Sequence, residues 1–195
     1  LLLAGLFIGG LFFGRIARLA FPTQRQDTLR ALFWQFMQIL IFNLALIFLL
    51  MVLLFPIALA TTLLAAINPD LAQIALFLMG LVLIWLLFPL VFAPHGVFAL
   101  RQNVVSATLT SLRLVRFFLP GASLFLVVLF VISQGLDIIW RIPPSDSWML
   151  LLGLGGHAFI SSSLIAASFV YYRGGIEWMQ ANLKKIMQPS SPTRA

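Results

Sequence analysis

One histidine lies well inside an apolar stretch of the chain, in the segment GLGGHAFISSS that begins at Gly153. An ionisable side chain within a membrane span is a candidate functional residue, because its charge is costly in hydrocarbon. One interpretation of His157 is structural, with the imidazole bonded to Ser161 one helical turn further on, or to a neighbouring helix. The small residues of that interface are the helix-packing candidates Gly153, Gly156, Ser161 and Ser162.

A second interpretation gives His157 a cofactor. Gly153 lies four residues earlier on the same helix face and would leave room for a flat ring beside the imidazole. This spacing resembles that of antenna helices that bind bacteriochlorophyll, and the resemblance implies an axial ligand to (bacterio)chlorophyll or another tetrapyrrole. His95 follows Pro94 at the opposite membrane boundary, where we expect a headgroup or helix-end contact, so the two histidines are not expected to share one haem.

The remaining polar residues do not form a catalytic set. The chain contains no cysteine, which excludes thiolate nucleophiles and Cys-ligated metals. We expect Asp70 and Asp146 to cap helices, Asp137 to pair with Arg141, and Glu177 to lie on a solvated face. The sequence therefore predicts no catalytic residue, no metal site and no enzyme activity.

The composition indicates the class of protein. Of 195 residues, 62% are hydrophobic and 9% are charged, against about 25% charged in a typical soluble domain. Runs without Asp, Glu, Lys or Arg are each at or above the ~20 residues that cross a bilayer, and they cover 31–69, 71–100, 117–136 and 147–172. The predicted fold class is an all-α polytopic membrane protein.

We predict a single transmembrane domain over residues 1–195. The chain starts without an initiator Met, so we expect the first span to be the end of a helix whose beginning is missing. The predicted spans are approximately 1–13 (partial), 33–60, 71–93, 118–139 and 148–171.

Basic residues determine the predicted orientation. Of 12 Lys and Arg residues, only Arg141 lies in a connection on the outer side. Because positively charged loops stay in the cytoplasm, we place the basic connections and the C-terminus on the cytoplasmic side of a bacterial inner membrane. The net charge of +7 then favours an anionic lipid surface as partner rather than nucleic acid.

Two amphipathic helices are expected in the inner interface, at about 97–116 and 175–187, before a disordered tail at 188–195. On a helical wheel, residues 97–116 have a narrow polar stripe on an otherwise apolar surface, which is typical of a helix lying in the membrane plane. Contacts with lipid headgroups are expected from the basic residues Arg101, Arg113, Arg116, Lys184 and Lys185.

The layout repeats along the chain. A shift of about 76 residues aligns the segment that begins at Arg25 with the one that begins at Arg101, and Asp70 with Asp146. The predicted unit is one interfacial segment followed by one outward hairpin.

The second of these segments shows a resemblance. The run HGVFALRQN from His95 to Asn103, followed by SLRLVR from Ser111 to Arg116, resembles the repeated cytoplasmic element of uncharacterised bacterial six-helix membrane proteins. These are similar to the membrane domain of some glycerophosphodiester phosphodiesterases. The resemblance covers about residues 94–185, although Asn103 stands where that family often has Ser. It implies three hairpins with interfacial helices, and no enzymatic role, because the phosphodiesterase barrel is absent from this sequence.

Together these features favour a non-catalytic multi-pass membrane subunit that scaffolds partner proteins or organises lipid, as an accessory component of a pigment-protein or respiratory complex. Its expected partners are membrane lipids and other integral membrane subunits, with 148–171 as the preferred docking helix. The alternative is a transporter or handling protein for small solutes or lipid. No acid lies deep in any predicted span, which disfavours ion-coupled transport.

The cofactor interpretation of His157 predicts the effect of one substitution. The His157→Leu variant should lose any bound pigment, because leucine has no lone pair to ligate the central metal. The visible absorption of protein purified from native membranes measures this, and a variant that retains the pigment would contradict the interpretation.

Overall fold

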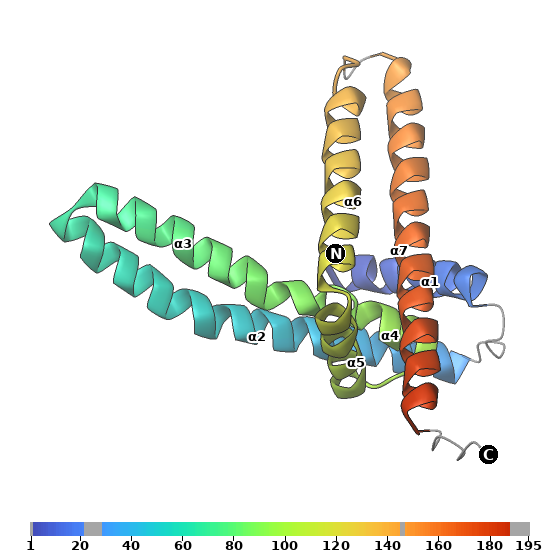
Figure 1. Ribbon diagram of the computed structural model, residues 1–195. Coiled ribbons are helices and arrows are strands. Elements are labelled where there is room, and N and C mark those ends of the chain that lie inside the picture. Colours follow the sequence, from blue (N-terminus) through green and yellow to red (C-terminus); the bar gives the residue numbers. More distant parts are fainter. Residues whose placement is uncertain (1, 22–28, 145–146, 188–195) are drawn as a thin grey trace, which may run out of the picture. The chain divides into compact units, whose positions relative to one another are not determined.

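The computed structural model describes residues 2–21, 29–144 and 147–187, with side chains for all of these except 2, 3 and 183–187. Within these ranges the chain forms helices and no strand, which confirms the all-α prediction (Figure 1). The elements are α1 (Leu2–Ala20), α2 (Leu29–Ile67), α3 (Pro69–Leu87), the 3₁₀ turn η1 (Phe88–Leu90), α4 (Ala93–Leu100), α5 (Val104–Phe117), α6 (Leu119–Trp140) and α7 (Met149–Met187).

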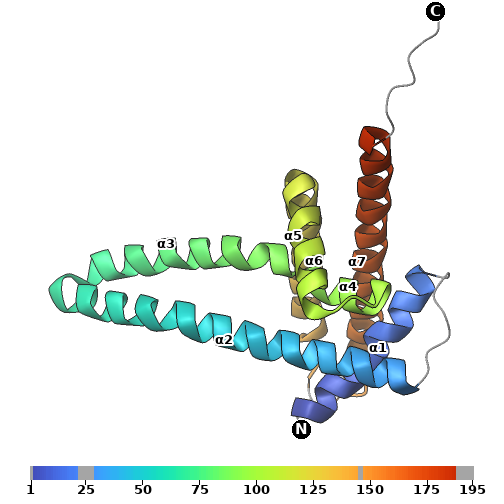
Figure 2. The ribbon, with the colours of Figure 1, turned by 90° about the horizontal axis from the view of Figure 1, so that it is seen from below.

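The chain divides into two compact units. The first comprises Leu1–Phe12 with Arg25–Leu112, and the second comprises Phe13–Gln24 with Arg113–Ala195. Each unit contains one helical hairpin, formed by α2 and α3 in the first (Figure 2) and by α6 and α7 in the second (Figure 1).

Four helical stretches in the described residues are long and apolar enough to cross a membrane, and they indicate a membrane-embedded protein. They are Leu29–Ile67, Pro69–Leu100, Leu119–Trp140 and Met149–Asn182. Residues 2–13 of the predicted partial span belong to α1, which continues past Arg15 and Arg18 and is not among these four.

Two of the helices are longer than a membrane is thick. Both α2 and α7 contain 39 residues, which gives each a length of about 58 Å against about 30 Å for the hydrocarbon core. The predicted interfacial segment 175–187 is therefore not a separate helix, since α7 continues through it without a break. The predicted disordered tail 188–195 lies outside the described residues.

The tip of the first hairpin is closed by an asparagine. The side-chain oxygen of Asn68 accepts hydrogen bonds from the backbone N–H groups of Asp70 (2.9 Å) and Leu71 (3.3 Å) and so caps α3. The capping role expected of Asp70 thus belongs to Asn68, while Asp70 lies in the first turn, where its charge favours the helix dipole. Asp146, the corresponding residue before α7, lies outside the described residues.

The structure corrects the single helix expected over 97–116. This segment forms α4 and α5, separated by Arg101, which adopts a left-handed backbone conformation (φ 51°, ψ 35°). The N–H of Gln102 donates to the carbonyl of Gly96 (3.2 Å), and the side chain of Asn103 accepts from the N–H of Ser106 (2.8 Å) to begin α5. Some of the residues that formed the polar stripe on the helical wheel, Gln102 and Asn103, therefore lie in the break between α4 and α5.

Contacts hold this α4–α5 corner in place within the first unit. The N–H of Val104 donates to the side-chain oxygen of Gln38 on α2 (2.9 Å), and the hydroxyl of Ser111 donates to the carbonyl of Pro89. The corner also contains most of the buried residues of this unit, namely Phe92, Ala93, His95, Gly96, Val97, Phe98, Ala99, Ala107 and Ser111. The predicted repeat of about 76 residues stays a prediction.

The core of the second unit lies on the C-terminal half of α7. Phe169 and Tyr172 are fully buried, Tyr171 stacks on Phe125 with ring centroids 4.2 Å apart, and Arg173 donates to the carbonyl of Ala20 (2.9 Å). Arg173 also pairs with Glu177 at 2.7 Å, with the Glu177 side chain 61% exposed. Aromatic packing and the two contacts of Arg173 thus occur together in this part of α7.

Gly96 provides a test of the α4–α5 corner. A Cβ at this position would lie 3.0 Å from the Cβ of Ala107 and 3.2 Å from its Cα, so Gly96→Ala should destabilise the protein by about 1–3 kcal/mol through overpacking. Gly80→Ala is the matched control, because nothing lies within 4 Å of its Cβ position. Thermal unfolding in detergent measures both, and equal Tm values for the two variants would contradict the packing described.

Candidate functional site

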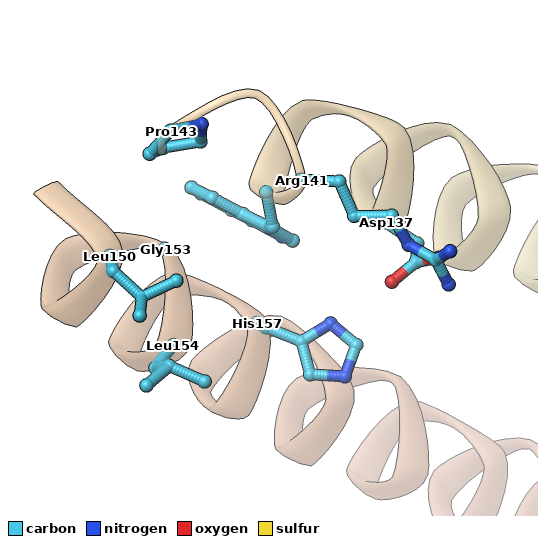
Figure 3. A pocket seen from close by; sticks show the side chains of 8 residues that line it. Asp137, Arg141, Pro143, Leu150, Gly153, Leu154 and His157 are labelled. Atoms are coloured by element: carbon cyan, nitrogen blue, oxygen red, sulfur yellow. The ribbon is translucent and has the colours of Figure 1, made fainter. Parts of the chain in front are cut away.

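An open groove lies between α6 and α7, close to the connection that joins them. It has a volume of about 330 Å³ and is lined by Asp137, Trp140, Arg141, Pro143, Leu150, Gly153, Leu154 and His157. Figure 3 shows the imidazole of His157 projecting from α7 into the space between the helices, on the side where Asp137 lies on α6 and Arg141 directly follows that helix. The fold therefore brings His157 together with two charged residues that the sequence analysis treated separately.

The two charged residues of the groove neutralise each other. Arg141 Nη2 lies 2.6 Å from Asp137 Oδ2, one helical turn apart, as the sequence predicted. The side chain of Arg141 is 78% exposed and that of Asp137 29% exposed, so the pair contributes at most about 1 kcal/mol to stability. It provides the groove with one cationic and one anionic group and no net charge.

Trp140 fills the space beside the glycines of α7. A Cβ on Gly153 would lie 3.2 Å from the carbonyl oxygen of Trp140, and a Cβ on Gly156 would overlap the indole ring. These glycines therefore allow close contact within the hairpin, and the room that the cofactor interpretation assigned to Gly153 is bordered by Trp140. Within the described part of the chain, the buried indole nitrogen of Trp140 has no hydrogen-bond acceptor.

His157 is an exposed side chain that borders the groove. The expected bond to Ser161 is not formed among the described residues, and the neighbouring Ser162 donates to the carbonyl of Ala158 in its own helix (2.6 Å). The described residues contain no group of three or more His, Cys, Asp or Glu side chains that could hold a metal ion. Ligation of a tetrapyrrole by His157 stays a prediction.

His95 occupies a different environment from the one expected. It is 6% exposed and its ring meets that of Phe92 edge to face, with centroids 5.4 Å apart. This burial corrects the headgroup contact that the sequence suggested, whereas the position of His95 in the first turn of α4 agrees with the alternative, a helix-end contact.

The predicted headgroup residues fall into two groups. Arg113 and Arg116 are exposed on α5, and Arg101 is partly exposed at the α4–α5 corner, whereas Lys184 and Lys185 are in α7 with side chains outside the described set. Arg101 also borders a second hollow, with Arg30, Ala31 and Trp34. Sequence reasoning missed Arg30 and Trp34, although their spacing of four residues places them on one helix face.

Comparison with known proteins identifies no relative: no family model, curated protein or solved structure matches this chain. The resemblance to six-helix bacterial membrane proteins therefore stays a prediction. The function has to be argued from the structure itself.

Two adjacent glycines of α7 test the contact with Trp140. Gly156→Ala should displace the indole ring, lower the stability by about 1–3 kcal/mol and shift the tryptophan fluorescence. Gly155→Ala is the matched control, because its Cβ position is open. Adding Trp140→Leu to Gly156→Ala should restore the Tm, and a Gly156→Ala variant that behaves like Gly155→Ala would contradict the contact.

Proposed function

We propose that the protein is a non-catalytic multi-pass membrane subunit that scaffolds partner proteins and organises lipid. The observation that supports this best is the exposure of its apolar spans. In each of the four candidate spans, at most 6% of the most apolar 18-residue window is buried. Apolar helix surface of this extent suits lipid tails or the helices of a partner.

The polar side chains in the spans support the same function. The serine and threonine hydroxyls and the Asn43 amide named below donate to carbonyl groups of their own helices, one turn earlier, whereas Gln38 accepts from the N–H of Val104. A side chain bonded in this way offers little to a polar solute, which favours a scaffold over a transporter of small solutes. Donor and acceptor pairs of this kind are Asn43 with Ile39, Thr61 with Ile57, Thr62 with Ala58, Ser123 with Leu119, Ser162 with Ala158 and Ser163 with Phe159.

α7 is the proposed docking helix for a partner. Gly153 and Gly156 are used within the hairpin, but Gly155 has no atom near its Cβ position and Ala158 is exposed. Phe159, also on α7, is 71% exposed. Small residues beside an exposed aromatic ring would let a partner helix approach closely and pack around that ring.

The groove favours the alternative function, lipid handling. Leu150 and Leu154 form an apolar wall, and the Asp137–Arg141 pair and His157 supply polar groups beside it. An amphipathic lipid matches this combination. We also propose that the basic connections and the C-terminus face the cytoplasm, because together they hold all of the Lys and Arg residues except Arg141.

Photo-crosslinking distinguishes a partner from bulk lipid. Benzoylphenylalanine in place of Phe159 should crosslink to a discrete protein in native membranes. The same residue in place of Phe77 on α3 is the matched control, because Phe77 is a phenylalanine of similar exposure, 66% against 71%, and should crosslink to lipid alone.

Gentle purification provides the decisive counter-test. Absence of a protein adduct at Phe159, together with a monodisperse preparation that contains no other subunit, would overturn the scaffold proposal in favour of lipid handling. A visible spectrum of the same preparation tests for a pigment.

A further inference from the structure

A hollow in the first unit lies beside the beginning of α2. Its volume is about 310 Å³ and it is lined by Arg30, Ala31, Trp34 and Arg101. Two arginines and one tryptophan thus border the same space, although α2 and the α4–α5 corner are far apart in the sequence. The volume is large compared with the ~30 Å³ that one water molecule occupies in the liquid, so a headgroup of several heavy atoms fits.

The backbone fixes the position of Arg101 relative to this hollow. Arg101 is the only non-glycine residue in the described ranges with a positive φ, at 51°, a conformation that costs roughly 1–2 kcal/mol for a residue with a Cβ. The N–H of Gln102 secures this turn on the carbonyl of Gly96. The N–H of Val104 then bonds the side chain of Gln38 at 2.9 Å, and Gln38 lies one turn after Trp34 on α2.

These groups together match the headgroup of an anionic phospholipid. Guanidinium groups bind phosphate oxygens through paired N–H donors, and tryptophan prefers the membrane interface, where its ring contacts both apolar and polar atoms. The described residues that line the hollow include no carboxylate, while Asp27, nearby in sequence, lies outside the described residues. Both arginines also belong to connections on the proposed cytoplasmic side, whose leaflet contains anionic lipid.

We propose that Arg30, Trp34 and Arg101 form a binding site for the phosphate of an anionic phospholipid of the inner leaflet. The two arginines hold the phosphodiester, and the indole of Trp34 lies against the glycerol part. The site deepens the lipid-organising role proposed above and rests on it, by assigning that role to one hollow and one class of lipid.

Native mass spectrometry of the full-length chain in detergent tests the site, with phosphatidylglycerol as probe and phosphatidylcholine for comparison. Wild type should retain phosphatidylglycerol preferentially. Arg30→Gln and Arg101→Asn should each weaken its binding by about fivefold to tenfold. Asparagine is chosen at position 101 because it tolerates the left-handed backbone, so the charge is removed while the turn is preserved.

The control is Arg15→Gln, which removes an exposed arginine of α1 that does not line the hollow and is not among the predicted headgroup residues. It should change the affinity by less than about twofold, because salt screens an exposed charge that does not contact the lipid. Thermal unfolding of each variant confirms that the chain is folded, and the weakened binding should occur at unchanged Tm.

Three outcomes would overturn the site. The first is that Arg30→Gln and Arg101→Asn both retain the lipid like wild type, and the second is that Arg15→Gln weakens binding as much as they do. The third is that inorganic phosphate or glycerol 1-phosphate displaces phosphatidylglycerol at equal concentration, which would identify a site for free phosphate. A negative result here does not alter the expected crosslinking at Phe159, so failure of the lipid site can be distinguished from failure of the scaffold proposal.

Discussion

The backbone of a membrane span has no water with which to form hydrogen bonds, so its N–H and C=O groups must bond within the span itself. This constraint accounts for the long uninterrupted helices α2 and α7. It also accounts for the serine and threonine hydroxyls of the spans, such as that of Thr62, which donates to the carbonyl of Ala58 at 2.7 Å. Polar groups satisfied inside their own helices leave an apolar exterior.

The same constraint moves specific polar contacts to the places where helices end. At each end, backbone groups lose their intrahelical partners and need others. Asn68 supplies them at the tip of the first hairpin, Ser147 at the beginning of α7 and Gln38 at the beginning of α5. The groove and the hollow both border helix ends. The groove lies beside the end of α6, and the hollow lies beside the α4–α5 corner.

The features predictable from the sequence are those that depend on local composition. The apolar runs predicted the membrane-spanning helices, and the four-residue spacing of Asp137 and Arg141 predicted their ion pair. The break at Arg101 was not predictable from a helical wheel, because the wheel assumes a continuous helix with 100° per residue. On such a wheel, Gln102 and Asn103 fall on one side and look like part of a polar helix face. A helix N-cap signal at Asn103 was present, since Asn favours that position.

Tertiary contacts account for the other differences. Gly153 and Gly156 were identified as packing residues, but nothing in their spacing indicated that Trp140 of the preceding helix would contact them. Likewise, Arg30 and Arg101 border one hollow because Gln38 holds the α4–α5 corner on α2. Contacts of this kind could not be predicted from the sequence, because they join residues of different helices that are brought together only by folding.

The location of these contacts bears on how the proposed scaffold would distinguish one partner from another. Apolar helices associate with lipid tails and with other apolar helices at similar free energy, because hydrocarbon provides no hydrophobic driving force between them. Selectivity must therefore come from close packing of small residues or from charged groups at helix ends. In the proposed scaffold, Gly155 and Ala158 on α7 would provide the first, and Arg30 with Arg101 would provide the second. A scaffold of this kind would select a protein through the span and a lipid through the corner, with separate residues for each.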